Sequence, residues 1–114
     1  MIAVIFEVEP HPEKRDAYLT LAAEMRSLLE EVDGFISVER FESLTQPGKL
    51  LSLSFWQDEE AVAAWRKLER HRHAQTKGRT SYFQDYRLRI AGVLRDYGMN
   101  ERGQAPADSV AMHG

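Results

Sequence analysis

Residues 50–68 read LLSLSFWQDEEAVAAWRKL, and the hydrophobic period changes within this stretch. The first seven residues alternate, which is typical of a strand, and one face carries Leu51, Leu53 and Phe55. Asp58 follows at the position of a helix N-cap, with two glutamates in the favourable first turn. The next apolar side chains recur every three or four residues, at Ala61, Val62, Trp65 and Leu68. The stretch therefore predicts a strand followed directly by an amphipathic helix.

The chain before this stretch repeats the same change of period. Residues 2–9 alternate and predict a strand, whereas residues 13–32 step by three and four and predict a helix of about five turns. Residues 35–44 alternate again, and a turn signal at residues 46–49 connects them to the strand at 50–56. These two strands are therefore expected to form a hairpin.

The chain after the stretch is more polar. Residues 69–79 predict a short helix or an irregular crossing segment, and residues 82–95 predict the last strand. Residues 99–114 lack periodicity and are interpreted as a tail that is mobile or leans on a neighbour. We therefore expect one domain over residues 1–98 and a C-terminal tail over residues 99–114.

The predicted order β-α-β-β-α-β is typical of an α+β ferredoxin-like fold, with a four-stranded antiparallel sheet and two helices on one face. The other face would carry Ala3 and Ile5 or their opposite set, and monomers rarely leave such a face in water. Either a second chain covers it or it lines a pocket. We expect a homodimer in which two sheets pack into an α/β barrel.

Composition narrows the function classes. The chain has 114 residues, 15 Lys and Arg, 18 Asp and Glu, a formal net charge of −3 and no cysteine. The slight acidity argues against a nucleic-acid partner, and the lack of cysteine removes thiolate metal sites and a cysteine nucleophile. No apolar run is long enough for a signal peptide or a membrane span, so we expect no membrane partner and a cytoplasmic location.

Several motifs together resemble the antibiotic biosynthesis monooxygenase family. They are Phe55 to Ala61, Ala64-Trp65-Arg66, His71-x-x-Ala74-Gln75-x-x-Gly78-Arg79, Tyr86 to Ala91 and Val93 to Gly98. The resemblance covers about residues 1–98 and implies a dimer of ferredoxin-like protomers. It also implies a monooxygenase that oxidises a small apolar, aromatic or quinol-like molecule with O₂ and without a cofactor. The alternative is a non-catalytic ligand-binding or stress-related module of the same fold.

One branch of the family cleaves haem, and its pattern matches this chain only in part. That branch has an asparagine on the first strand, a tryptophan on the second helix and a histidine nine or ten residues later. Trp65 fits the tryptophan, but residues 3–8 contain no asparagine, and His73 follows Trp65 by eight residues. Haem cleavage is therefore the least favoured of the three candidate functions.

His71 and His73 are the candidate acid–base groups, since histidine titrates near neutral pH. They lie in the run Arg70 to His73, so a solvated helix surface explains them equally well. The resemblance favours His71. Two histidines two residues apart, without further converging ligands, do not make a metal site, and we expect none.

Four further residues are candidates for substrate binding: Trp65, Arg79, Tyr82 and Phe83. Trp65 has the spacing of a core residue and could also form a pocket wall. Arg79 could hold an anionic or phenolate oxygen, or pair with Asp85 or Glu69 as an exposed ion pair. The two aromatic residues can wall a cavity or fill a core.

Overall fold

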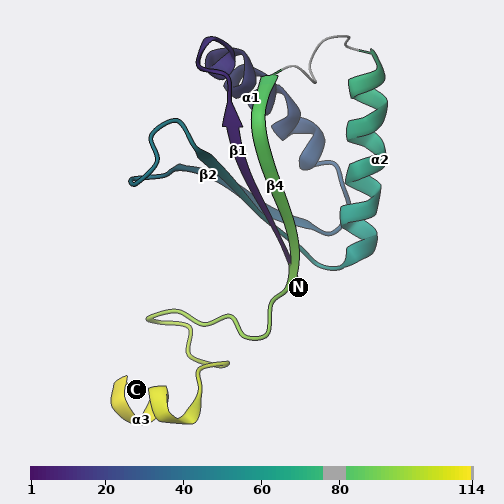
Figure 1. Ribbon diagram of the computed structural model, residues 1–114. Helices are drawn as coiled ribbons and strands as arrows, with labels where there is room; N and C mark the ends of the chain where they lie inside the picture. Colours follow the sequence, from purple (N-terminus) through teal and green to yellow (C-terminus); the bar gives the residue numbers. More distant parts are fainter. Residues whose placement is uncertain (76–81, 114) are drawn as a thin grey trace.

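The computed structural model describes residues 1–75 and 82–113, with side chains over residues 1–69 and 82–112 (Figure 1). The strands are β1 (Ile2–Pro10), β2 (Phe35–Glu42), β3 (Leu50–Trp56) and β4 (Phe83–Gly92). The helices are α1 (Arg15–Leu29), α2 (Glu59–Gln75) and α3 (Ala107–His113), with a 3₁₀ turn η1 (Pro12–Lys14) before α1.

The strands form one antiparallel sheet in the order β2-β3-β1-β4. This topology confirms the predicted ferredoxin-like fold. Away from the register shifts near Phe35 and Phe83, the residues that face α1 and α2 have even numbers on every strand. One row across the sheet consists of Arg40, Ser52, Phe6 and Leu88. We call this the helix face. The opposite side, the open face, carries odd-numbered residues from Ala3 to Glu9 on β1.

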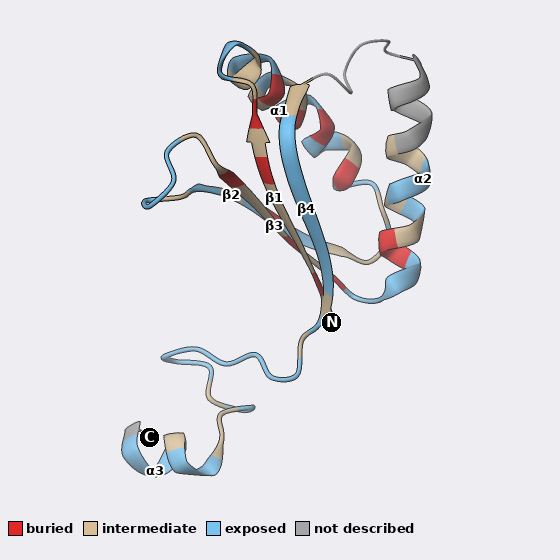
Figure 2. Ribbon diagram, viewed as in Figure 1, coloured by how far each residue is buried: buried red, intermediate tan, exposed pale blue. Residues whose placement is uncertain are grey.

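The core lies on the helix face in two clusters of buried side chains (Figure 2). One contains Leu29, Val38, Trp56, Ala61 and Val62, and the other contains Val8, Tyr18 and Leu50. Trp56 is only 1% exposed and packs edge-on against Phe35, with ring centroids 5.2 Å apart. Both large helices therefore pack on one side of the sheet.

Local chemistry explains how the chain turns from β3 into α2. The Ala61 N–H donates to Asp58 Oδ1 at 2.9 Å, which confirms the predicted N-cap. Gly34 lies beside this turn with a φ of +91°, and a Cβ there would stand 2.8 Å from the Cβ of Ala61. Only glycine fits this position without strain.

Several element boundaries differ from those predicted. The helix expected over residues 13–32 begins as the 3₁₀ turn η1 and ends at Leu29. The polar segment after residue 68 continues α2 to Gln75, and the tail contains the short helix α3. These polar segments lack the apolar stripe on which a sequence-based assignment depends.

A register shift between Glu9 and Pro10 changes the position of Phe83. Simple alternation places Phe83 on the same face as Asp85, but a bulge of this kind redirects side chains. Phe83 instead packs on the helix face, with its ring centroid 5.9 Å from Phe6 and 5.4 Å from Tyr18.

The segment after Gly92 forms an arm that lies apart from the sheet and both large helices (Figure 1). Hydrogen bonds within the arm order it: Arg102 Nη2 donates to Ser109 Oγ at 2.8 Å, and the Asp96 N–H donates to Gln104 Oε1 at 2.8 Å. Its apolar side chains Leu94 and Met99 are 86% and 90% exposed.

Candidate functional site

A cavity of about 270 Å³ lies between the helix face of the sheet and helices α1 and α2. Its walls are hydrocarbon: Met25 and Leu29 from α1, Val62 and Trp65 from α2, and Leu88 and Ile90 from β4. Leu88 and Ile90 are 51% and 44% exposed, so the β4 edge of the cavity is open to solvent. Such a concave, largely apolar space suits a small organic ligand.

Two serines on the central strand β3 explain why space remains here. Ser52 and Ser54 occupy successive helix-face positions between Leu50 and Trp56. A serine is much smaller than the Leu or Trp that flank the pair, so the floor of the cavity is not filled. Ser54 is buried, and its hydroxyl accepts a hydrogen bond from Trp56 Nε1 at 2.9 Å. The floor is therefore both hollow and polar.

Arg40 brings a positive charge to this floor. It lies on β2 opposite Ser52, at a helix-face position, and it lines the cavity. Its Nε is buried and has no hydrogen-bond partner among the residues that the structure describes. A buried donor without a partner is uncommon and calls for an explanation.

Tyr18 of α1 lies beside Arg40. Burial raises the pKa of the Tyr18 phenol above 10.0, and the Arg40 guanidinium acts in the opposite direction. Glu69 of α2 adds a smaller upward effect on this pKa. Tyr18 therefore remains a neutral phenol at physiological pH, able to donate or accept a hydrogen bond.

The structure brings two of the predicted site residues to the cavity. Trp65 and Phe83 both line it, and the Trp65 ring lies 6.5 Å from that of Trp56. Tyr82 instead packs against the cluster of Val8, Tyr18 and Leu50. The substrate-binding role of all three residues stays a prediction.

The other three predicted residues cannot be placed against the cavity. His71 and His73 belong to the last turns of α2, and their side chains lie outside the described residues. Arg79 also lies outside them. Their proposed acid–base and oxygen-binding roles stay predictions.

Sequence reasoning missed four residues that shape the site: Tyr18, Arg40, Ser52 and Ser54. Two features of the sequence could have indicated three of these residues. Ser52 and Ser54 interrupt the apolar parity between Leu50 and Trp56, and Arg40 shares the parity of the buried Val38. Small or charged residues at inward positions of a sheet often mark a site rather than a core.

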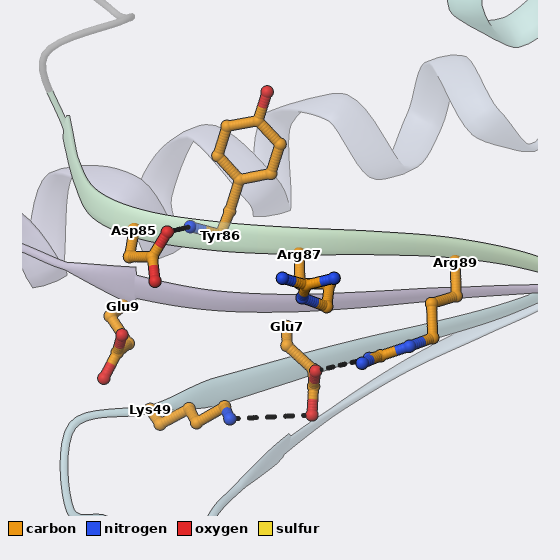
Figure 3. Close-up of a pocket in the computed structure, with 7 residues that line it drawn as sticks. All are labelled: Glu7, Glu9, Lys49, Asp85, Tyr86, Arg87 and Arg89. Atoms are coloured by element: carbon orange, nitrogen blue, oxygen red, sulfur yellow. Dashed lines mark hydrogen bonds and ion pairs between the residues drawn. The ribbon is translucent and has the colours of Figure 1, made fainter.

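A second hollow, of about 320 Å³, lies on the open face and differs in character (Figure 3). Arg89 Nη1 donates to Glu7 Oε2 at 2.7 Å, and Lys49 Nζ lies 3.6 Å from Glu7 Oε1. The Arg89 hydrogen bond and the charge of Lys49 hold the pKa of Glu7 below 4.5. Figure 3 shows the Tyr86 ring pointing away from this network. An exposed network of ion pairs therefore lines this hollow, and the described residues give it no apolar wall.

The described residues offer neither a metal-binding cluster nor a membrane-spanning helix. Within residues 1–69 and 82–112, no three His, Asp or Glu side chains are grouped closely enough to hold a metal ion. None of the helices described within 1–75 and 82–113 is long and apolar enough to cross a membrane.

Comparison with known proteins places this chain in a family. The model of the antibiotic biosynthesis monooxygenase family matches residues 1–77. The chain is 46% identical over 101 residues to a protein of Pyricularia oryzae named jasmonate monooxygenase ABM, covering 89% of this chain and 47% of that protein. The chain thus spans about half the length of this relative. It is also 32% identical to the uncharacterized Bacillus subtilis protein YqjZ, covering 82% of this chain and 79% of YqjZ.

Solved structures share the fold at low sequence identity. Rv0793 of Mycobacterium tuberculosis has a TM-score of 0.71 at 20% identity, covering 85% of this chain and 98% of that one. MhuD, a haem degrader of the same organism, has a TM-score of 0.70 at 17% identity, covering 86% of this chain and 100% of that one. With the family match and the relatives above, the chain belongs to the antibiotic biosynthesis monooxygenase family.

Proposed function

We propose that this protein is a monooxygenase that binds a small, largely apolar molecule in the helix-face cavity. The observation that carries the proposal is the cavity itself, an apolar space of about 270 Å³ beside Trp65 with a polar floor. The relative named jasmonate monooxygenase supports the reaction class. The proposed substrate is aromatic, quinol-like or a compact alicyclic molecule of the jasmonate type.

A quinol-like substrate supplies the electrons for the reduction of O₂ itself, so the proposed reaction needs no cofactor. An activated CH₂ group becomes C=O as one oxygen atom enters the product and the other leaves as water. The four electrons that reduce O₂ come from the two C–H bonds, so this reaction balances without an added reductant. The protein must then bind the substrate, orient it and accept a proton. His71 or His73 is the proposed proton acceptor.

Oxygen uptake tests this proposal over a panel of polycyclic quinols, and over jasmonate with an added two-electron reductant, because insertion of one oxygen atom into a C–H bond needs two further electrons. At least one compound is expected to consume O₂ above the blank and to yield a product that carries one added oxygen atom. His71→Ala or His73→Ala is expected to lower that rate by about 10²-fold or more, as for loss of a general base. The absence of uptake with every compound would contradict the catalytic proposal and favour the non-catalytic binding module.

Haem is a poorer fit than a small apolar substrate. The helix face of β1 presents Val4 and Phe6 to the cavity, so this strand offers no polar side chain where the haem branch has an asparagine. We therefore derive no step through haem. A saturable one-to-one Soret band after haem addition would overturn this ranking.

We further propose that the protein is a homodimer formed through the open face. Ile5, Leu51 and Leu53 lie at the centre of that face and are only half-buried in one protomer. Apolar side chains in such a patch are stabilised when a second chain removes them from water. Burial of this patch agrees with the proposed barrel. A monomer in sedimentation at micromolar concentration would contradict it.

A further inference from the structure

Three charged side chains line the helix-face cavity among the described residues: Arg40, Arg66 and Glu69. Arg40 is the one of these that lies on the floor of the cavity, opposite Ser52. A guanidinium group in a largely apolar cavity is complementary to a ligand that carries a negative charge. The lining thus indicates a negative charge on the ligand in addition to its apolar character.

The position of Arg40 identifies the atom that is available to such a ligand. Its Nε is buried and unpartnered among the described residues, although nearly all buried donors in folded proteins have a partner. The neighbouring groups on the floor are the Tyr18 phenol and the Ser52 hydroxyl, which are neutral and can donate to an oxygen anion. A carboxylate placed here would receive a charge-assisted hydrogen bond from Arg40 and further bonds from these neighbours.

The apolar residues of α2 set the orientation of the ligand. Trp65 and Val62 line the cavity from this helix, whereas Arg40 lines it from β2. With its carboxylate on Arg40, the ligand places its apolar part against Trp65 and Val62.

We infer that the cavity selects small apolar carboxylic acids, and that Arg40 is the residue that binds the carboxylate. This inference rests on the proposed function only for the identity of the cavity as the substrate site. It narrows the substrate from an apolar molecule to an apolar acid, and it assigns Arg40 the role of a specificity-determining residue.

Calorimetric titration with naphthylacetate and its neutral amide tests the inference directly. The two probes share ring and linker and differ in the charge of the end group. The wild-type protein is expected to bind the acid about tenfold or more tightly than the amide, the scale of one charge-assisted hydrogen bond. Equal affinities would overturn the inference, and this arm requires no variant.

Three arginine variants then locate the effect. Arg40→Met keeps the apolar stem and is expected to reduce the preference for the acid to about twofold or less, whereas Arg40→Lys retains part of it. Arg66→Met tests the other cavity arginine, and Arg26→Met on the outer side of α1 is the matched control. An acid preference that survives in Arg40→Met, or that is lost only in Arg66→Met, would overturn the assignment to Arg40.

The binding readout is separate from turnover. If the acid preference depends on Arg40 but no panel compound consumes O₂, the ligand class holds and the monooxygenase proposal fails. If O₂ is consumed and the acid preference is absent, the monooxygenase proposal holds and the inference about Arg40 fails.

Discussion

The two faces of the sheet use the same strands for opposite purposes. On β3, the helix face carries Leu50, Ser52, Ser54 and Trp56, whereas the open face carries Leu51, Leu53 and Phe55. The helix face is covered by two helices and still contains a polar hollow. No element that the structure describes covers the open face of the protomer, and this face has an apolar centre flanked by an ion-pair network.

This contrast shows where the sequence departs from the simplest way to fill a core. A strand built for stability alone would place its large apolar residues toward the helices. Here two serines and an arginine face inward, and the continuous apolar run faces outward. This contrast supports the proposals that the helix face binds a ligand and that the open face associates with a second chain.

Trp56→Ala is expected to have the largest effect on the protomer. Trp56 is 1% exposed and packs against Phe35 and Trp65, so its truncation should lower the free energy of unfolding by about 3–5 kcal/mol. Urea unfolding measures this change. Phe55→Ala on the open face is the matched control, and equal losses from the two variants would contradict the assignment of the core to the helix face.

Leu53→Glu tests association through the open face. A glutamate at the centre of the proposed interface would bury an uncompensated charge, so the dimer dissociation constant should rise by about 100-fold or more. Sedimentation of the variant at micromolar concentration should show a monomer with wild-type far-UV circular dichroism. An unchanged dimer would place the interface elsewhere.

Alkaline titration tests the burial of Tyr18 beside the cavity. Burial raises its folded pKa above 10.0, so the phenol contributes stability that is present below pH 10.0 and lost as the pH rises through the folded value. The phenolate absorbance of the wild type minus that of Tyr18→Phe should titrate with a midpoint above 10.0. A midpoint at or below 10.0 would show that the phenol is open to water.

Glu7→Gln is expected to have the smallest effect. The pKa of Glu7 lies below 4.5, so its ion pairs contribute stability above that pH, and the contribution is lost as the pH falls through the folded value. Because this network is exposed in one protomer and flanks the apolar centre of the open face, solvent screens it and the effect should be near the limit of detection in urea unfolding. A large loss at neutral pH would contradict this position at the rim and would place the network inside the proposed interface.

Much of the fold could be predicted from the sequence, because periods of two and of three to four mark faces that must be buried. The alternation around β3 and the Asp58 cap led to the correct four strands, two large helices and topology, although several boundaries and the short helix α3 were missed. The position of Phe83 could not be predicted, since it depends on the register shift opposite Glu9 and Pro10. A bulge of this kind is determined by pairing between strands and not by local pattern.

Less of the candidate site than of the fold could be predicted from the sequence. Trp65 and Phe83 could be proposed because aromatic residues at these positions resemble those of a known family. Arg40 and Ser52 could not, because each looks ordinary within its own strand. They form a floor only when the hairpin register places them opposite each other.

Turnover with isotopically labelled dioxygen tests the central claim that chemistry takes place on the helix face. The experiment compares the wild type with Ser52→Phe, which fills the cavity floor, and with Ser37→Phe, which adds the same side chain to the open face. The account predicts one labelled oxygen atom in the product of the wild type and of Ser37→Phe, with the product from Ser52→Phe reduced by about tenfold or more. Equal incorporation by the wild type and Ser52→Phe would show that the reaction does not use this cavity.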